Sequence, residues 1–226
     1  MLKTSQMIPG WGLQRPKGNI QMMYDFMMAP LRMVLLPDHV SEKCHMTSLR
    51  AERFAMVLPE LKGAVLDIGA GDNLLLNTYI DSKSESAPDY QDAKTSVGVD
   101  VFDWGAGCTI IESSDDLPFE NERFDTVAFI ACINHIPERL GALKEAVRVL
   151  KPGGKIVVTM INRFIGELGH MLWWYSEDKH RHVDEEELMG MDEKEVVQLF
   201  KDAGIDGVEI KRFCYGMNTL YTVSVD

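Results

Sequence analysis

The stretch that decides the fold of this chain is Val65-Leu66-Asp67-Ile68-Gly69-Ala70-Gly71-Asp72-Asn73. Its three leading apolar residues predict a short buried strand of a parallel sheet. The two glycines then allow a sharp turn and a close approach of the backbone to a ligand. The helix expected next presents free amide groups at its start. A strand, a glycine turn with an acid and a helix suit a nucleoside ligand, but such a glycine pattern is common, so the ligand depends on the rest of the chain.

The bulk composition limits the size and the partners of the protein. The chain has 226 residues, of which 46% are hydrophobic, and this suits one α/β domain with a small cap. Its formal net charge is −12 and its sequence pI is near 4.9. Because so acidic a surface repels phosphate backbones, we expect no nucleic-acid partner.

Cysteine usage and hydropathy indicate the compartment. The four cysteines are far apart and form no CxxC pair, which favours a reduced, intracellular environment. The first ten residues are polar and lack the apolar core of a signal peptide. No apolar run approaches the ~20 residues that cross a bilayer. We therefore predict a cytoplasmic protein without stable membrane insertion.

The N-terminal residues 1–58 are expected to form a helical cap, followed by one domain of residues 59–226. Residues 20–36 are rich in methionine, and Pro30 predicts two short helices there. A further helix is predicted over residues 47–60, starting at Thr47 or Ser48 and ended by Pro59. This segment either covers a pocket or packs as ordinary core, because methionine suits both. The hydroxyl of Tyr24 either reaches a ligand or is satisfied inside the protein.

The rest of the chain alternates strands and helices. Strands are predicted at 65–68, 96–100, 109–111, 124–131, 155–161, 208–213 and 220–225, and helices at 74–80, 140–150 and 193–202. Asp192 and Glu195 make a capping box for the last helix. Residues 81–90 are predicted to be a polar loop, and residues 162–190 follow no simple period. Seven strands with helices between the first five predict a three-layer α/β sandwich.

Asp100 ends the second predicted strand. In a doubly wound sheet, the acid at this place lies by the ribose hydroxyls of a nucleoside ligand, because a carboxylate accepts two hydrogen bonds from a diol. Asp100 comes later than the usual spacing of ~20 residues, and the polar loop accounts for the delay. The alternative is a carboxylate that only caps a loop.

Four motifs together resemble one family. Asp67-Ile68-Gly69-Ala70-Gly71 is similar to its first motif and Asp100 to its ribose-binding acid. Leu117-Pro118-Phe119 with Phe124-Asp125-Thr126-Val127 is similar to its "LPF…FD.V" segment, and Leu150-Lys151-Pro152-Gly153-Gly154 to its "LKPGG" turn. The chain thus resembles the class I S-adenosylmethionine-dependent methyltransferases, in the branch that includes the quinone-biosynthesis enzymes. The resemblance covers roughly residues 60–226 and implies a Rossmann-like, mostly parallel seven-stranded sheet with an antiparallel last strand.

The resemblance also implies S-adenosyl-L-methionine as cofactor and a set of residues that contact it. These residues are Asp67, Gly69, Ala70, Gly71, Asp100, Val101, Ser113, Ser114, Asp115 and Ala131. Two positions depart from the family pattern. Asn73 stands where a third glycine is common, and asparagine tolerates the left-handed conformation that this turn needs. Ser113 stands where many relatives carry an aspartate that binds the adenine amine, and Asp115 is the expected substitute.

The residues expected on the acceptor side follow the fourth and fifth strands. Methyl transfer needs alignment and exclusion of water, and a base helps if the acceptor is a hydroxyl. His135 is the candidate base; alternatively it shapes the pocket or binds backbone. Trp173 and Trp174 are expected to form an aromatic wall for the acceptor or to seal the lid. His180 and His182 bind the acceptor, form a solvated loop, or with Asp184 make a short metal pattern, and we predict no metal site.

Three functions are consistent with these residues. The first, which we expect, is a methyltransferase for a small-molecule acceptor, acting on a hydroxyl oxygen. The second is a methyltransferase for a macromolecule, where the net charge disfavours RNA but not protein. The third is a non-catalytic binding subunit with the same fold, which the complete set of cofactor motifs disfavours.

Overall fold

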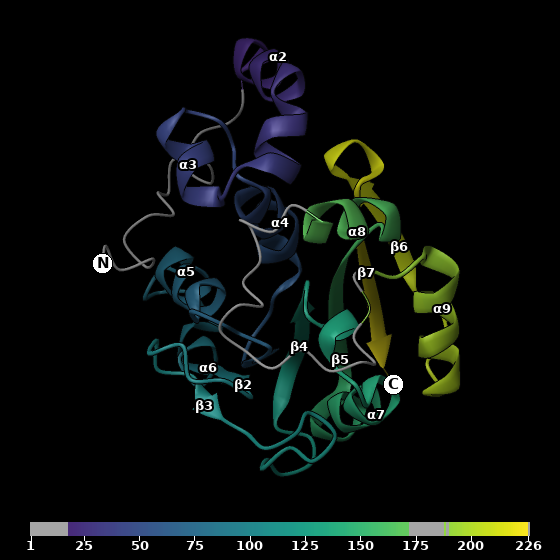
Figure 1. The fold of residues 1–226 in the computed structure, drawn as a ribbon. Coiled ribbons are helices and arrows are strands. Elements are labelled where there is room, and N and C mark those ends of the chain that lie inside the picture. Colours follow the sequence, from purple (N-terminus) through teal and green to yellow (C-terminus); the bar gives the residue numbers. More distant parts are fainter. Residues whose placement is uncertain (1–17, 172–187, 189, 226) are drawn as a thin grey trace.

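The computed structural model describes residues 18–171, 188 and 190–225 of the chain. Its centre is a seven-stranded sheet with the strand order β3-β2-β1-β4-β5-β7-β6 (Figure 1). The strands are β1 (Val65–Ile68), β2 (Val97–Asp100), β3 (Thr109–Ile110), β4 (Phe124–Ile130), β5 (Leu150–Ile161), β6 (Glu209–Phe213) and β7 (Asn218–Val225).

The direction of the strands is that of the predicted Rossmann-like sheet. Strands β1 to β5 pair in parallel along the order β3-β2-β1-β4-β5. Strand β7 pairs antiparallel with both β5 and β6, so β6 points the same way as β5. The predicted antiparallel last strand is confirmed.

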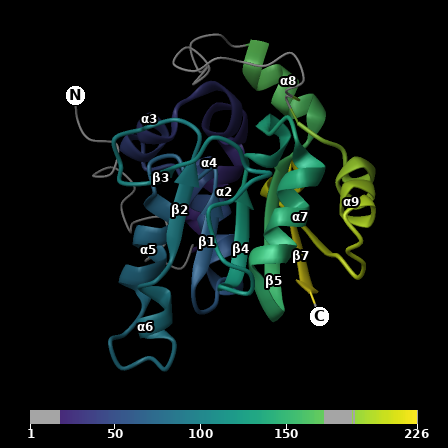
Figure 2. The same cartoon turned by 90° about the horizontal axis from the view of Figure 1, so that it is seen from below.

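Helices cover both faces of the sheet (Figures 1 and 2). On one face, α4 (Leu49–Val57), α5 (Leu74–Ser82) and α6 (Tyr90–Ala93) share a buried apolar cluster with β1, β4 and β5. On the other, α7 (Arg139–Val149) and α9 (Glu193–Asp202) share the larger cluster. Two apolar faces covered by helices make the three-layer sandwich that the sequence predicts.

Strand β1 lies in the middle of the sheet, and all four of its residues are buried. Leu66 and Ile68 pack with α7, whereas Val65 packs with α4 and α5. Alternation along the strand places Asp67 on the same face as Val65. The sequence thus puts one carboxylate into an otherwise apolar strand, next to the glycine turn.

Several segments differ from the predictions, among them the unpredicted short helices α3 (Asp38–Lys43) and α6. Strand β5 begins at Leu150 and not at Lys155, because Leu150 pairs with Phe124 before the register shifts at the glycines. Within residues 162–190, where no period was found, Arg163–Met171 forms the helix α8. The capping box of Asp192 and Glu195 on α9 is confirmed.

The N-terminal segment forms several short helices. These are α2 (Asn19–Met27), the π-helix η2 (Leu31–Leu35), α3 (Asp38–Lys43), α4 and the 3-10 helix η3 (Leu58–Glu60). The break at Pro30 is confirmed, although the second helix is a π-helix. The side chain of Ser48 accepts a hydrogen bond of 3.1 Å from the amide of Ala51, which confirms it as the N-cap of α4. The α-helix ends at Val57, and Pro59 lies in η3.

A buried polar network connects the N-terminal helices, beside the buried side chains of Met33 and Met46. Arg32 is 1% exposed and donates to the carbonyls of Asp25 (2.7 Å) and Thr47 (2.8 Å) and to the Glu52 carboxylate (3.0 Å). It also donates to the hydroxyl of Tyr215, next to β7 (3.3 Å). The carboxylate of Asp25 accepts from the Thr47 amide and hydroxyl. Sequence patterns did not indicate this network, because its members are far apart in the chain.

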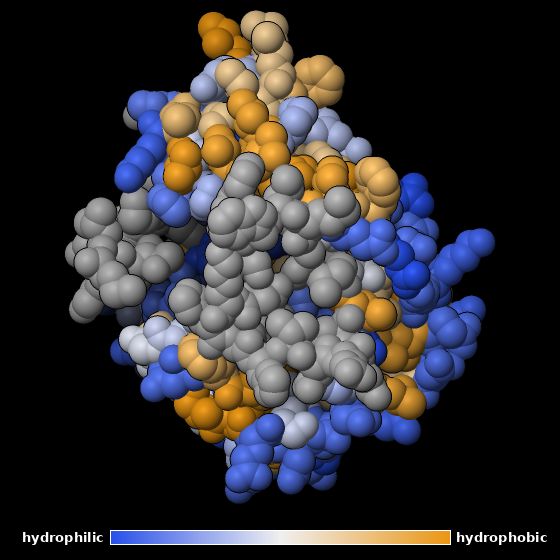
Figure 3. Space-filling model, viewed as in Figure 1, coloured by the Kyte–Doolittle hydropathy of each residue, from blue (hydrophilic) through white to orange (hydrophobic). Residues whose placement is uncertain are grey.

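The methionines of α2 face outward. Ile20, Met23, Phe26 and Met27 are more than half exposed, and apolar side chains gather over these helices at the top of the space-filling view (Figure 3). In the described ranges, no helix combines the length and the apolar character needed to cross a membrane.

Candidate active site

The carboxyl ends of β1 and β2 meet at a turn that fits a nucleoside ligand. The amides of Gly69 and Ala70 both donate to the carbonyl of Val99, at 2.9 and 3.0 Å, and so fix the turn onto β2. Gly69 has φ of 72°, and a Cβ built on it would lie 2.6 Å from the Cβ of Cys132. Both the backbone conformation and the space therefore require glycine here.

The departure at Asn73 is accommodated as expected. Asn73 has φ of 56°, in the left-handed region, and serves as the N-cap residue of α5. Its side chain lies against Gly98, where an added Cβ would come within 2.4 Å of Oδ1. Sequence reasoning missed Gly98, although a glycine inside a strand signals a close approach of another group.

Asp100 lies at the end of β2 and touches the glycine turn. Its Oδ2 accepts a 2.9 Å hydrogen bond from the amide of Gly71, and its Oδ1 accepts a 3.0 Å bond from the amide of Phe102. These bonds hold the carboxylate in place and leave further lone pairs on both oxygens. Asp100 can therefore accept from a ribose diol beside the turn. The predicted neighbour, Val101, is 61% exposed at this edge.

Asp67 is the most unusual charged group of the site. It is 2% exposed, and its Oδ1 has no hydrogen-bond partner among the described residues. Burial, with added repulsion from Asp100 and Asp72, raises the pKa of Asp67 to about 8. A buried carboxylate of this kind calls for a cation or a hydrogen-bond donor. The ammonium group of S-adenosylmethionine supplies both, so the residues present fit this cofactor.

The predicted adenine residues lie together in one loop. The hydroxyl of Ser113 donates to the carboxylate of Asp115, and the backbone amide of Asp115 donates to the hydroxyl oxygen of Ser113 at 3.4 Å. Ser114 is buried, and Asp115 packs against Gly141 of α7. Ser113 and Asp115 thus form one unit that presents a carboxylate, as the expected substitution requires.

The end of β4 adds the third side of the site. Ala131 has φ of 56°, and its amide donates to the carbonyl of Thr159 on β5 at 3.1 Å. The thiol of Cys132 donates to the carbonyl of Ile68 at 2.9 Å, which ties β4 to β1. Ala131 was expected at the site. Sequence reasoning did not predict a role for Cys132, whose side chain occupies the space beside Gly69.

His135 lies in the 3-10 helix η4 (Ile133–His135) after β4. The amide nitrogen of Asn134 donates to the carbonyl of Leu188 at 2.8 Å and lies 3.0 Å from Nε2 of His135. Because the Leu188 carbonyl fixes this end of the amide as the donor, Nε2 accepts, and the neutral ring carries its proton on Nδ1. The amide of Leu188 in turn donates to the carbonyl of Asn134 at 3.0 Å. Asn134 was not expected, and it joins residue 188 to this edge of the sheet.

The other predicted acceptor residues are only partly described. The hydroxyl of Tyr24 donates to the carbonyl of Cys44 at 3.0 Å, so it has a partner among the N-terminal helices. Trp173, Trp174, His180 and His182 lie outside the described residues, and so does Asp184.

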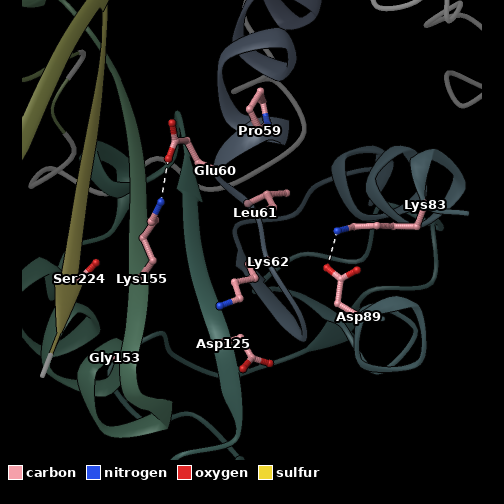
Figure 4. A pocket seen from close by; sticks show the side chains of 10 residues that line it. All are labelled: Pro59, Glu60, Leu61, Lys62, Lys83, Asp89, Asp125, Gly153, Lys155 and Ser224. Carbon is pink, nitrogen blue, oxygen red and sulfur yellow. Dashed lines mark hydrogen bonds and ion pairs between the residues drawn. The ribbon is translucent and has the colours of Figure 1, made fainter. Parts of the chain in front are cut away.

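A hollow lies at the opposite edge of the sheet, and none of the residues predicted to contact the cofactor or the acceptor line it. It has about 460 Å³ of space near the amino ends of β1 and β5. Its charged side chains include the ion pairs Lys155–Glu60 (2.8 Å) and Lys83–Asp89 (2.5 Å) (Figure 4). Since parallel sheets bind ligands at the carboxyl ends of their strands, this hollow is not the candidate site.

Comparisons with known proteins agree with this geometry. The family model described as a methyltransferase domain matches residues 42–210. The ubiquinone/menaquinone biosynthesis C-methyltransferase UbiE of Bordetella parapertussis is 28% identical over 187 residues, covering 74% of this chain and 72% of that protein. The demethylmenaquinone methyltransferase of Bacillus cytotoxicus is 28% identical over 121 residues, covering 47% of this chain and 51% of the relative.

Solved structures show the same fold at low sequence identity. A methyltransferase of Thermotoga maritima, titled a possible histamine N-methyltransferase, gives a TM-score of 0.55 at 18% identity, with 77% of this chain and 88% of that chain covered. The methyltransferase CalH in complex with SAH gives a TM-score of 0.54 at 15% identity, with 92% of this chain and 59% of that chain covered. The chain belongs to the methyltransferase domain family and is a class I S-adenosylmethionine-dependent methyltransferase.

Proposed function

We propose that the protein methylates a small aromatic acceptor of the quinol class, at a ring carbon. The sequence favoured a hydroxyl oxygen as the methyl acceptor. The relatives whose own length is covered to 72% are, however, named C-methyltransferases of quinone biosynthesis. S-adenosylmethionine supplies an electrophilic methyl group on a sulfonium. The single observation that carries cofactor use is the buried carboxylate of Asp67, without a hydrogen-bond partner on Oδ1 within the described ranges, beside Asp100 and the glycine turn.

The cofactor residues have distinct proposed roles. Asp67 pairs with the ammonium group, and the close approach of the backbone at Gly69, Ala70 and Gly71 leaves room for the amino-acid end. Asp100 accepts from the ribose hydroxyls, and Val101 flanks the base. Ser113, Ser114 and Asp115 bind the adenine amine, and Ala131 closes the site from β4.

His135 is proposed to act on the acceptor. A ring carbon becomes a better nucleophile when a neighbouring hydroxyl loses its proton, so a base is useful for carbon as well as for oxygen. The lone pair of Nε2 faces the amide of Asn134. An acceptor hydroxyl that replaces this amide at Nε2 would place its proton within reach of the imidazole. Tyr24, Trp173, Trp174, His180 and His182 stay predicted residues of the acceptor side.

The experiment that tests this function is a product analysis. The protein is incubated with S-adenosylmethionine carrying a deuterated methyl group and with 1,4-naphthoquinol under reducing conditions. We expect a naphthoquinol that carries the label on a ring carbon, identified by NMR. An O-methyl ether as sole product would refute the carbon assignment, and absence of any product would refute the quinol class.

A further inference from the structure

Two buried polar groups at the ends of β5 and β7 have no role in the site described above. Thr159 is 0% exposed and Asn218 is 1% exposed. The hydroxyl Oγ1 of Thr159 and the amide nitrogen Nδ2 of Asn218 lack a hydrogen-bond partner in the described part of the chain. Buried polar groups in native proteins are nearly always paired, so two such donors call for a partner that the described residues do not supply.

The pairing of the strands places the two side chains next to each other. Thr159 lies opposite Leu220, and Asn218 lies opposite Ile161, in the antiparallel pair of β5 and β7. Residues two apart on a strand share a face, so Thr159 and Asn218 are diagonal neighbours on one face. Diagonal neighbours of this kind can bracket one small group between them.

The same face carries the cofactor carboxylate. Asp67 lies opposite Ala128 on β4, and Ile130, two residues further along, lies opposite Thr159. Thr159 therefore shares the face of Asp67 and lies nearer the carboxyl edge. The carbonyl of Thr159 also accepts from Ala131, which is proposed to close the cofactor site. A group held by Thr159 and Asn218 would lie just past the amino-acid end of the cofactor, where a methyl acceptor must be.

The orientation of the Asn218 amide is fixed by a cation. Its Oδ1 accepts a 3.2 Å hydrogen bond from Nε of Arg53 on α4. Nδ2 is therefore the free end of this amide and can only donate. The guanidinium polarises the amide and strengthens the donor at Nδ2. The hydroxyl of Thr159 can donate as well, so the two side chains offer two donors to one oxygen.

We propose that Thr159 Oγ1 and Asn218 Nδ2 together bind one ring oxygen of the methyl acceptor, as a carbonyl, a hydroxyl or a phenolate. This inference rests on the proposed function, since it needs a small acceptor that carries oxygen. It adds the residues that hold the acceptor from the β5–β7 side, opposite the loop of His135. Two donors occupy lone pairs of this oxygen and so disfavour its own methylation. The adjacent carbon of the deprotonated ring would then take the methyl group as the S–CH3 bond breaks, and it would lose its ring proton to solvent.

Two variants and one matched control test the proposal. Asn218→Asp keeps an oxygen for Arg53 and replaces the donor by an acceptor, and Thr159→Val removes the hydroxyl at nearly constant volume. Thr126→Val is the control, because Thr126 is also buried on this face but its hydroxyl bonds the amide (3.1 Å) and the carbonyl (3.0 Å) of Lys62. Each protein is assayed for methylation of 1,4-naphthoquinol, for SAH affinity by calorimetry and for melting temperature.

We expect both site variants to raise the KM for naphthoquinol at least tenfold while the Kd for SAH stays unchanged. Thr159→Val should keep or raise the melting temperature, because no bond is lost, whereas Thr126→Val should lower it and keep the KM. If the wild type methylates the quinol and the site variants have the same KM for it as the wild type, the inference fails and the proposed function stands. If the wild type forms no product, the proposed function fails, and the inference fails with it because it needs that acceptor. A lower melting temperature for Thr159→Val would show that its hydroxyl already has a structural partner and would also overturn the inference.

Discussion

The cofactor side and the acceptor side of this protein are built in different ways. On the cofactor side, the turn after β1 is fixed by backbone bonds to Val99 and by the carboxylate of Asp100 on the neighbouring strand. On the acceptor side, Arg53 and Asn218 meet across 165 positions of the chain, and two donors stay without partners among the described residues. The comparison teaches that the ligand shared by the family is encoded in short motifs. The ligand special to one member is encoded in contacts between distant residues.

The largest effect is expected from Asp67, a buried carboxylate on the cofactor side whose Oδ1 has no hydrogen-bond partner among the described residues. Its pKa is raised from 3.8 to about 8 in the folded protein. Between these values the folded state holds a proton that the unfolded chain has released, so the free energy of unfolding should fall as pH rises from about 4 to about 8. Each unit of pKa corresponds to about 1.4 kcal/mol, and the full window to roughly 6 kcal/mol.

The measurement is urea unfolding at pH 5 and pH 8 for the wild type and Asp67→Asn, without ligand. We expect the variant to lose most of this pH dependence, because asparagine does not titrate. SAH should stabilise the wild type more at pH 8 than at pH 5, because its ammonium group favours the ionised carboxylate. Equal slopes for both proteins would show that Asp67 is not the titrating group.

The next effect concerns His135, on the acceptor side. If His135 is the base, His135→Ala should lower kcat about a hundredfold, as for other positioned bases, and keep the affinity for SAH. The control is His39→Ala, because His39 is exposed on α3. Steady-state kinetics with naphthoquinol and calorimetry with SAH measure both quantities. A change confined to the KM would leave His135 only a role in shaping the pocket.

A smaller effect is expected at the glycine turn. Gly69→Ala should destabilise the protein by about 2–4 kcal/mol, because it adds left-handed strain and a clash with Cys132. A Cβ added at Gly71 has no atom within 4 Å. Gly71→Ala should therefore lower the free energy of unfolding only by the backbone strain, about 1–2 kcal/mol. Chemical denaturation of the two variants compares them directly. Equal losses would mean that the turn relaxes away from Cys132.

The smallest effect tests whether the helix α4 couples the cofactor side of the site to the acceptor side. Arg50 on α4 pairs with Asp72 in the glycine turn at 2.6 Å, and α4 also carries Arg53. Both partners are partly exposed, so Arg50→Met should cost about 0.5–1 kcal/mol of stability, with a dependence on salt. SAH affinity should weaken less than threefold. A loss of more than tenfold would show that α4 couples the two sides tightly.

Local patterns in the sequence predicted the elements around the glycine turn, whereas contacts between distant residues were not predicted. The positions of the strands, the glycine turn, the left-handed conformation of Asn73 and the capping box on α9 follow from local patterns whose physical causes lie within a few residues. Gly98, Cys132, Thr159 and Asn218 were missed, because their importance comes from what packs against them across the sheet. The Asp25–Arg32 network was missed for the same reason, whereas the helix α8 was missed although its residues are amphipathic at helical spacing.

The central claim is that the cofactor binds at the ends of β1 and β2, held by Asp100. The most direct measurement is a calorimetric titration of SAH into the wild type, Asp100→Ala and Asp103→Ala. Asp103 is the matched control, because it lies on the same loop and, among the described residues, its Oδ1 accepts from the amide of Gly105 at 2.8 Å. We predict 1:1 binding to the wild type, a loss of affinity of at least tenfold in Asp100→Ala from the missing charged acceptor, and no change in Asp103→Ala. Equal affinities of all three proteins, or no binding to the wild type, would contradict the claim.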